Sequence, residues 1–281
     1  MDANIEKLLD LSGKVAIITG GAKGIGYGIT TRLSQAGAKC AICGRNKERV
    51  DRVVEQMRGF GLDVFGFGCD VSDEASVARF VGDVVEQLGT VDILVNNAGN
   101  YPPNRLENIT LEEWDGVFAS NVRGMFLMTR EVVKEMKAKG HGGSIINCSS
   151  IGAFRCNYVG MSAYHSSKGA MISFTNHEAA EQGPFGIRVN TIAVGAIQAK
   201  GENNGIFTPD TIAFDMPIPK NAIPLGRFGC PADIGNTCVY LASDLSSFVN
   251  GIYLTADGGM SKVPTFGYRE LDLATSPNAN N

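Results

Sequence analysis

The stretch KVAIITGGAKGIG, residues 14–26, predicts a strand, a tight turn and the start of a helix. Residues 14–19 form a short apolar run with β-branched side chains, which is typical of a buried strand. A glycine-rich turn follows. Residues 26–38 then show helical spacing, with Ile29 and Leu33 four positions apart and a stop at Gly37. The stretch therefore begins one strand–turn–helix unit.

The same alternation continues along the chain. Further strands are predicted at residues 39–44, 63–71, 91–99, 143–150, 187–195 and 251–259, with helices between them, including one or two long helices at 111–140. The strands lack polar alternation, as expected where helices cover both faces of a parallel sheet. We predict an α/β fold, a single-domain Rossmann-type doubly wound sheet of about seven parallel strands flanked by helices on both faces, spanning residues 1–260.

Two segments do not fit this alternation. Residues 196–222 read as a long irregular loop, and loops of that length inside a compact domain are usually binding loops or lids. We expect them to form a substrate loop. Residues 261–281 follow the last predicted strand and form a C-terminal extension with a polar end.

The composition excludes several classes of protein. A net charge of −4 over 281 residues, with no basic run, argues against a nucleic-acid or anionic-membrane surface. The N-terminus does not resemble a secretory signal, and no apolar stretch is long enough to span a bilayer. Seven scattered cysteines suggest reduced thiols in a cytoplasmic protein. Cys40 and Cys43 lie three apart on a predicted strand, so they should point to opposite faces rather than bind metal together.

The glycine turn is a candidate dinucleotide site, formed by Gly20, Lys23, Gly24, Ile25 and Gly26. A glycine-rich turn lets the backbone approach a pyrophosphate, and the helix N-terminus offers free N–H groups. A plain tight turn is the alternative. The position of the glycines in the first strand–helix unit of an alternating chain favours the dinucleotide.

The end of the second strand indicates which dinucleotide. An acid there would bind the ribose 2′-hydroxyl of NAD, but the place is taken by Gly44, followed by Arg45 and Asn46. Arg45 and Lys23 supply two cations, which favours the 2′-phosphate of NADP(H). If both are only solvated surface charges, NAD(H) remains the alternative.

Later strand ends add further cofactor candidates. Asp70 and Val71 end the third predicted strand, where a carboxylate can accept a hydrogen bond from adenine; a helix cap is the alternative role, although Ser72 or Asp73 suits it better. The fourth strand ends in three more candidates, Asn97, Ala98 and Gly99.

Tyr164 and Lys168 are four positions apart on a predicted helix and therefore share a face. A nearby ammonium stabilises a phenolate and lowers the pKa of a tyrosine, so such a pair makes a general acid/base. On spacing alone, two surface neighbours are the commoner explanation. His165 is about 100° around the helix from Tyr164 and is expected to pack or to line the cofactor pocket. The histidines are scattered and predict no metal site.

The order of the motifs along the chain favours the acid/base pair over two surface neighbours. Five motifs follow one another along the chain, each at a strand end or on the next helix: TGGAKGIG, NNAG, SNVRG with Asn121, SIINCSS and YHSSK. From about Leu11 to Gly259 the chain closely resembles the classical short-chain dehydrogenase/reductase family. The resemblance implies hydride transfer between a nicotinamide cofactor and a secondary alcohol or ketone.

The resemblance also implies residue roles. Tyr164 would exchange the proton of the substrate hydroxyl, and Lys168 would hold the nicotinamide ribose and lower the pKa of Tyr164. Asn121 would hold a relay water, and a serine would orient the substrate oxygen. Ser150 fits this serine better than Ser149, although one extra residue separates it from the tyrosine compared with the family.

The chain departs from the family after the sixth strand. Val194 and Ala199 stand where the family has proline and threonine, so the backbone of Ile197 is left to hold the carboxamide. The expected pocket is apolar and aromatic and suits a hydrophobic, possibly cyclic, substrate. Its candidate side chains are Tyr101, Phe154, Tyr158, Met161, Ile206, Phe207, Phe214 and Met216.

Other functions stay open. A 3-oxoacyl carrier-protein reductase is one alternative, an NAD-dependent alcohol or steroid-type dehydrogenase another, and a non-catalytic dinucleotide-binding protein a remote third. The resemblance implies a homotetramer or homodimer, and apolar segments at 111–136 and 247–254 are consistent with symmetric interfaces.

Overall fold

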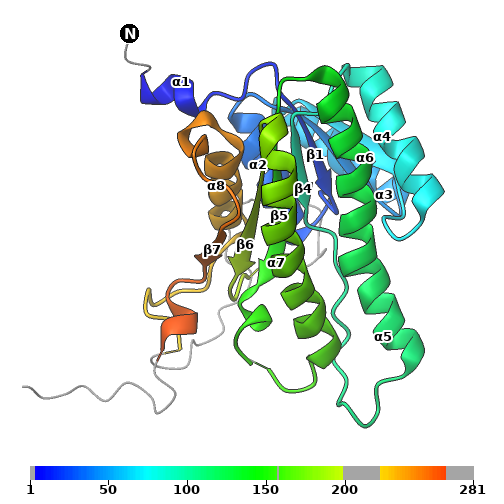
Figure 1. The fold of residues 1–281 in the computed structure, drawn as a ribbon, viewed down its shortest axis with the longest axis vertical. Coiled ribbons are helices and arrows are strands. Elements are labelled where there is room, and N and C mark those ends of the chain that lie inside the picture. The colour runs from blue at the N-terminus through cyan, green and yellow to red at the C-terminus, as the bar shows by residue number, and fades with distance from the viewer. Residues whose placement is uncertain (1–3, 157, 199–221, 264–281) are drawn as a thin grey trace, which may run out of the picture.

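The computed structural model describes residues 4–156, 158–198 and 222–263. These residues form seven parallel strands in the order β3-β2-β1-β4-β5-β6-β7, between two layers of helices (Figure 1). The fold class predicted from the sequence is confirmed. The strands are β1 Val15–Thr19, β2 Lys39–Gly44, β3 Val64–Gly68, β4 Ile93–Asn96, β5 Gly143–Ser150, β6 Ile187–Val194 and β7 Tyr253–Ala256.

The helices occupy the intervals between strands. They are α1 Ile5–Leu9, α2 Gly24–Gln35, α3 Lys47–Gly59, α4 Glu74–Leu88, α5 Leu111–Phe118, α6 Gly124–Lys139, α7 Ser162–Gln182 and α8 Pro231–Ala242. Among the described residues, no helix combines the length and apolarity needed to cross a membrane.

Alternate residues of the strands pack into two separate hydrophobic cores, one on each face of the sheet, and the strands are therefore apolar throughout. Ile18 packs with α2, α3 and α8 on one face, and Ile17 packs with α4 and α6 on the other. Cys40 belongs to the first core and Cys43 to the second, as their spacing predicted. All seven cysteines are free thiols.

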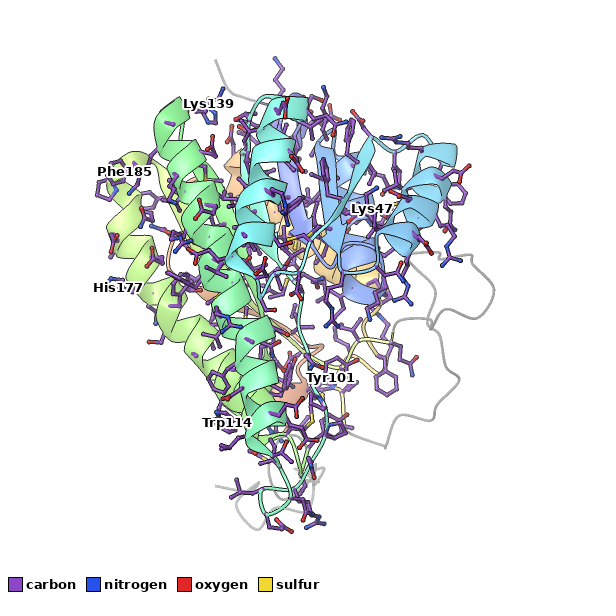
Figure 2. The ribbon with its side chains drawn as sticks, turned by 90° about the vertical axis from the view of Figure 1, so that its right-hand side faces the viewer. Lys47, Tyr101, Trp114, Lys139, His177 and Phe185 are labelled. Atoms are coloured by element: carbon purple, nitrogen blue, oxygen red, sulfur yellow. The ribbon has the colours of Figure 1, made fainter. Side chains whose placement is uncertain are left out.

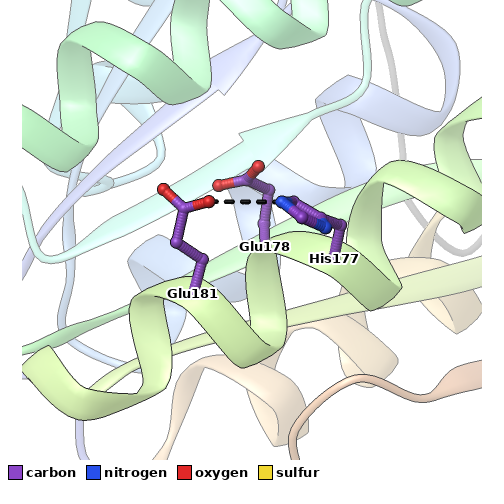
Figure 3. Close-up of side chains that lie close together, drawn as sticks. All are labelled: His177, Glu178 and Glu181. Carbon is purple, nitrogen blue, oxygen red and sulfur yellow. Dashed lines mark hydrogen bonds and ion pairs between the residues drawn. The ribbon is translucent and has the colours of Figure 1, made fainter.

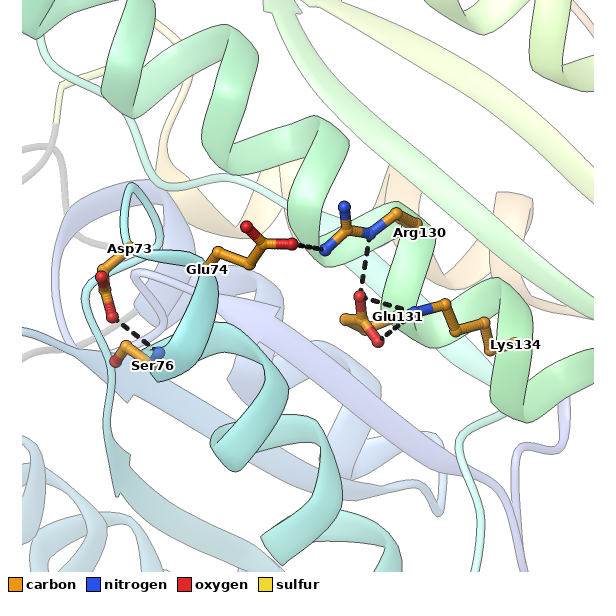
Figure 4. A network of polar contacts seen from close by, with 6 residues as sticks. All are labelled: Asp73, Glu74, Ser76, Arg130, Glu131 and Lys134. Carbon is orange, nitrogen blue, oxygen red and sulfur yellow. Dashed lines mark hydrogen bonds and ion pairs between the residues drawn. The ribbon is translucent and has the colours of Figure 1, made fainter.

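The third strand is shorter than predicted because its end turns early. β3 ends at Gly68, and the Asp70 carboxylate then accepts hydrogen bonds from the backbone N–H and the hydroxyl of Ser72. Asp73, rather than Asp70, caps α4 by accepting from the Ser76 N–H at 2.7 Å (Figure 4).

A charged network joins two helices of one layer (Figure 4). Arg130 of α6 donates to Glu74 at the start of α4 at 2.6 Å and to its neighbour Glu131 at 2.9 Å. Lys134 also bonds Glu131. The network ties the first turn of α4 to the middle of α6, although pairs this exposed contribute only about 0–1 kcal/mol each.

Helices α2 and α8 approach so closely that glycine is required at the crossing. A Cβ placed on Gly28 would lie 2.5 Å from the carbonyl oxygen of Pro231, and one on Gly235 would lie 2.6 Å from the Gly28 oxygen. Because both obstacles are backbone atoms, the helices themselves would have to move apart.

We therefore expect Gly28→Ala to lower the free energy of unfolding by about 1–3 kcal/mol, the usual effect of overpacking. Gly82→Ala is the matched control, since Gly82 lies inside α4 and a Cβ there meets nothing within 4 Å. The control should be neutral or stabilising by about 0.5–1 kcal/mol. Denaturant unfolding measures both, and equal stabilities for the two variants would contradict the account.

Candidate active site

The glycine turn after β1 is built for close approach to the backbone. Gly20 and Gly24 have positive φ values of 66° and 51°, a conformation that other residues rarely adopt. A Cβ on Gly26 would collide with the carbonyl oxygen of Gly20. The turn leads directly into α2, whose first N–H groups have no partners within the helix. Its shape fits a pyrophosphate without a side chain in the way.

The end of β4 is fastened to this turn through Thr19. The Thr19 hydroxyl accepts from the N–H groups of Asn97 and Ala98 at 3.0 and 2.9 Å. The Asn97 side-chain amide donates to the Thr19 carbonyl oxygen at 2.9 Å. Asn97 thus ties the fourth strand end to the first, while Ala98 and Gly99 continue along the same edge.

The predicted phosphate and adenine residues lie at the ends of β2 and β3. Arg45 and Lys23 are both exposed. Burial raises the pKa of Asp70, but hydrogen bonds from Ser72 and the charges of Arg45 and Arg123 lower it overall. Arg45 therefore lies close enough to Asp70 to affect its ionisation.

Asn46, which follows Arg45, and Val71, which follows Asp70, have structural roles. The Asn46 side chain caps α3 by accepting from the Arg49 N–H at 2.8 Å. Val71 packs so closely on Gly124 that a Cβ there would lie 2.9 Å from a methyl group of Val71.

Asn121 lies in a π-helical turn, Ala119–Arg123, that separates α5 from α6. It is 1% exposed, and both its amide N–H groups and its amide oxygen are hydrogen-bonded. Its amide donates to the Asn100 carbonyl oxygen at 3.0 Å and to Ser167 Oγ at 2.9 Å, and its oxygen accepts from the Asn100 N–H at 2.7 Å. Ser167, which the sequence analysis did not single out, in turn donates to the Tyr164 carbonyl oxygen. Its position three residues after Tyr164, on the same helix face, is the signal that points to it.

Ser150 and Tyr164 come together where β5 ends and α7 begins. The Ser150 hydroxyl lies close enough to Tyr164 to lower the pKa of its phenol. The Ser150 hydroxyl also accepts from the Gly152 N–H at 3.0 Å. Ser149 instead donates to the Lys168 carbonyl oxygen at 2.8 Å, which anchors α7 to β5. The structure thus brings Ser150, and not Ser149, to the tyrosine.

Lys168 is 4% exposed, and burial lowers its pKa to about 8. Its Nζ donates to the Cys148 carbonyl oxygen at 2.7 Å and lies 5.5 Å from the centre of the Tyr164 ring. A Cβ on Gly99 would lie 3.7 Å from this Nζ. The loop after β4 therefore reaches the lysine.

The pKa of Tyr164 differs in direction from the sequence-based expectation. Burial raises the pKa, and the hydrogen bond to Ser150 opposes that rise without reversing it. The expected lowering by Lys168 is not seen, because burial of the phenol dominates.

Tyr101 borders the proposed acid/base. Its ring is 65% exposed and meets the Tyr164 ring edge-on, with 5.8 Å between centroids. Tyr101 and Trp114 lie at the end of the molecule opposite to Lys139, the last residue of α6 (Figure 2). The site therefore occupies the carboxyl edge of the sheet, where parallel α/β folds bind ligands.

The remaining predicted pocket residues divide into two groups. Phe154 and Tyr158 are exposed, and Phe154 contacts Tyr253 of β7 with ring centroids 5.9 Å apart. Ile197 forms a bridge to Gly229 beyond β6. Met161 is half-buried and directly precedes α7. The others lie outside the described residues, namely Ala199, Ile206, Phe207, Phe214 and Met216.

His177 belongs to a grouping that its sequence position did not predict. With Glu178 and Glu181 on α7, it places three possible ligand atoms within 4.8 Å of one another (Figure 3). His177 pairs with Glu181 at 3.2 Å, and the Gln182 amide donates to both glutamates. These contacts explain the grouping without a metal ion.

Comparison with known proteins defines the class. A family model described as enoyl-(acyl carrier protein) reductase matches residues 20–261. D-threitol dehydrogenase of Mycolicibacterium smegmatis is 37% identical over 251 residues, 89% of this chain and 93% of that protein. NADP-dependent (R)-specific alcohol dehydrogenase of Lentilactobacillus kefiri is 38% identical, with 89% and 97% covered. 3-Oxoacyl-[acyl-carrier-protein] reductase of Thermotoga maritima is 36% identical, with 89% and 98% covered.

Comparison with solved structures points to the same class of protein. A short-chain type dehydrogenase/reductase from Mycobacterium marinum superposes with a TM-score of 0.81 at 31% identity, covering 92% of this chain and 99% of that one. A gluconate 5-dehydrogenase from Burkholderia cenocepacia, in complex with NADP and tartrate, gives 0.82 at 30% identity, with 93% and 100% covered. The chain belongs to the short-chain dehydrogenase/reductase family. It is an oxidoreductase that acts on alcohols and ketones with a nicotinamide dinucleotide.

The buried lysine makes stability depend on pH in a specific direction. Its pKa is about 8 in the folded chain and 10.5 ordinarily, so between these values the unfolded chain binds more protons. The free energy of unfolding contributed by Lys168 should therefore rise as the pH increases from 8 to 10.5.

Lys168→Met removes this titration. Unfolding of the wild type and of this variant should be compared across the same pH range. The wild type is expected to gain stability relative to the variant as the pH rises, and parallel stability curves would show that the lysine is not desolvated as described.

Proposed function

We propose that the protein is an NADP(H)-dependent oxidoreductase that interconverts a secondary alcohol and a ketone. The carrying observation is the juxtaposition of the Ser150 and Tyr164 hydroxyls with the buried Lys168, at the same sheet edge as the glycine turn. This arrangement offers two hydrogen-bonding groups to one substrate oxygen beside a place for a dinucleotide.

The chain's residues divide the chemistry between them. A bound nicotinamide supplies or accepts the hydride. In reduction, Ser150 holds the substrate oxygen and Tyr164 donates its proton to it. The raised pKa of Tyr164 keeps the phenol protonated near neutral pH, which suits this direction. In oxidation, the Lys168 ammonium favours the phenolate that accepts the proton.

The other predicted residues would hold and orient the cofactor and the relay water. Lys168 would bind the nicotinamide ribose when it turns from Cys148, and the Ile197 backbone would bind the carboxamide. Both side-chain N–H groups of Asn121 are already used, so its proposed relay water would donate to an oxygen of Asn121. Gly20, Gly24, Ile25, Gly26 and Lys23 would hold the pyrophosphate region, and Asp70 the adenine.

The preference for NADP(H) rests on charge at the end of β2. Gly44 offers no carboxylate, and exposed Arg45 stands beside it with Lys23 across the glycine turn. NAD(H) is the alternative cofactor. A relative described as NADP-dependent and a solved relative bound to NADP support the first.

Arg45→Ala should weaken the use of NADPH about tenfold or more, since a charge-assisted bond contributes about 1.5–3 kcal/mol, and should leave NADH use nearly unchanged. Arg79→Ala, on the exposed side of α4, is the control. Nicotinamide absorbance with a panel of ketones and alcohols measures both cofactors. A wild-type preference for NADH would overturn the assignment, and no turnover with any substrate would overturn the proposed activity.

The same panel tests the substrate. The exposed rings of Tyr101, Phe154 and Tyr158 support a hydrophobic, possibly cyclic, ketone or alcohol. The likeness to a 3-oxoacyl-carrier-protein reductase favours a second candidate, a 3-oxoacyl thioester. Cyclic ketones, open-chain polyols and a 3-oxoacyl thioester should therefore be compared, and the highest kcat/KM decides among them.

A homotetramer or homodimer is also part of the proposal. Edge strand β7 presents exposed Tyr253, preceded by exposed Phe248 and Ile252, and the helical layer presents exposed Leu111 and Phe126. Exposed apolar side chains on two separate faces support two symmetric contacts. Light scattering that gives the mass of a monomer would contradict this. A single domain to residue 260, a substrate loop at 196–222 and a cytoplasmic location complete the proposal.

A further inference from the structure

His165 follows Tyr164 directly but contacts a different part of the molecule. Its ring lies against Gly152, in the 3-10 turn Ile151–Ala153 that follows β5. A Cβ placed on Gly152 would lie 2.5 Å from His165 Nε2 and would collide with Cδ2. Because φ at Gly152 is not positive, the need for glycine at this position comes from the imidazole and not from the backbone conformation.

Gly152 in turn is hydrogen-bonded to the Ser150 hydroxyl of the proposed site. Its N–H donates to Ser150 Oγ at 3.0 Å, and the Ser150 hydroxyl lies close enough to Tyr164 to lower the pKa of its phenol. A serine hydroxyl has one proton and two lone pairs. With one lone pair held by Gly152, fewer orientations remain for the O–H, which is directed toward its other partners.

The segment between Ser150 and Tyr164 needs such a restraint. It runs from residue 151 to residue 163 between the two hydroxyl-bearing residues, and a connection of this length is less constrained than a tight turn. The His165 backbone is fixed by its N–H, which donates to the Met161 carbonyl oxygen at 2.8 Å. The ring is therefore carried by the first turn of α7, the same turn that carries Tyr164.

We propose that His165 is a positioning residue, whose ring holds Gly152 in place and thereby orients the Ser150 hydroxyl toward the substrate oxygen. The proposal rests on the proposed function of Ser150 and Tyr164. It gives His165 no contact with substrate and no proton to transfer.

The contact can be tested by compensation. Gly152→Ala pushes the turn away from the ring and should lower kcat about tenfold to a hundredfold, the effect of a misplaced catalytic group. His165→Ala leaves the turn unsupported and should lower kcat several-fold. In the double variant the new methyl group enters the space that the ring has left, so kcat should recover from the Gly152→Ala value toward that of His165→Ala.

Two further measurements separate positioning from damage to the fold. The Kd for NADPH, from nicotinamide fluorescence, should stay within about twofold of wild type in all three variants. The pH profile of alcohol oxidation should shift to higher pH in Gly152→Ala, because the Ser150 hydrogen bond that lowers the pKa of Tyr164 is weakened.

Gly169→Ala is the matched control. Gly169 lies on α7 beside the same turn, and a Cβ there makes only an ordinary contact of 3.7 Å with the Ala153 carbonyl oxygen. It should keep wild-type kcat. His165→Phe keeps a flat ring against Gly152 and should retain most of the activity that His165→Ala loses.

Three results would overturn the proposal: an unchanged kcat in Gly152→Ala, a double variant no better than Gly152→Ala, or a His165→Phe variant as impaired as His165→Ala. Should Gly152→Ala fail to fold, the two His165 variants still decide. A wild-type enzyme that turns over no ketone or alcohol would instead refute the proposed function. That outcome differs from the three above, which refute only the positioning role of His165.

Discussion

The three hydrogen bonds of the Asn121 amide hold the site together. They join the loop after β4 to the first half of α7, through Asn100 on one side and Ser167 on the other. Asn121 reaches both because the helix that carries it passes through a π-helical turn at this point. Together with the contact between the Tyr101 and Tyr164 rings, this junction fixes the loop bearing Gly99 against the helix bearing Tyr164 and Lys168.

Burial then sets the chemistry of the two ionisable groups. It raises the pKa of Tyr164 and lowers that of Lys168, so both are driven toward their neutral forms. Because the ordinary pKa values of the two groups are nearly equal, these opposite shifts move them apart, and the pKa of Lys168 now lies below that of Tyr164. The Ser150 hydrogen bond acts on the same tyrosine. A tyrosine and a lysine on an exposed helix would keep their ordinary pKa values, and these two depart from them because this edge of the sheet buries them.

The sequence was sufficient to predict the fold and the family. Alternating apolar runs gave β2 and β5 with their observed bounds, because in those runs the change of composition coincides with the end of the strand. β3 ended early because Asp70 forms a turn with Ser72, a contact within the loop that apolar patterning does not report. The π-helical turn was missed because helical spacing continues through 111–139 without a break. The contact of His165 with Gly152 depends on neighbours distant in the sequence, and the raised pKa of Tyr164 depends on burial; local spacing reports neither.

The most direct test of the central claim is the turnover of Tyr164→Phe, which removes one hydroxyl and leaves the ring. NADPH binding and turnover should be measured together on the intact chain with the best substrate of the panel. The account predicts that kcat falls by about 10²–10⁴-fold, the usual contribution of a general acid/base, while the Kd for NADPH stays near that of wild type. A variant that binds NADPH and turns over at the wild-type rate would contradict it.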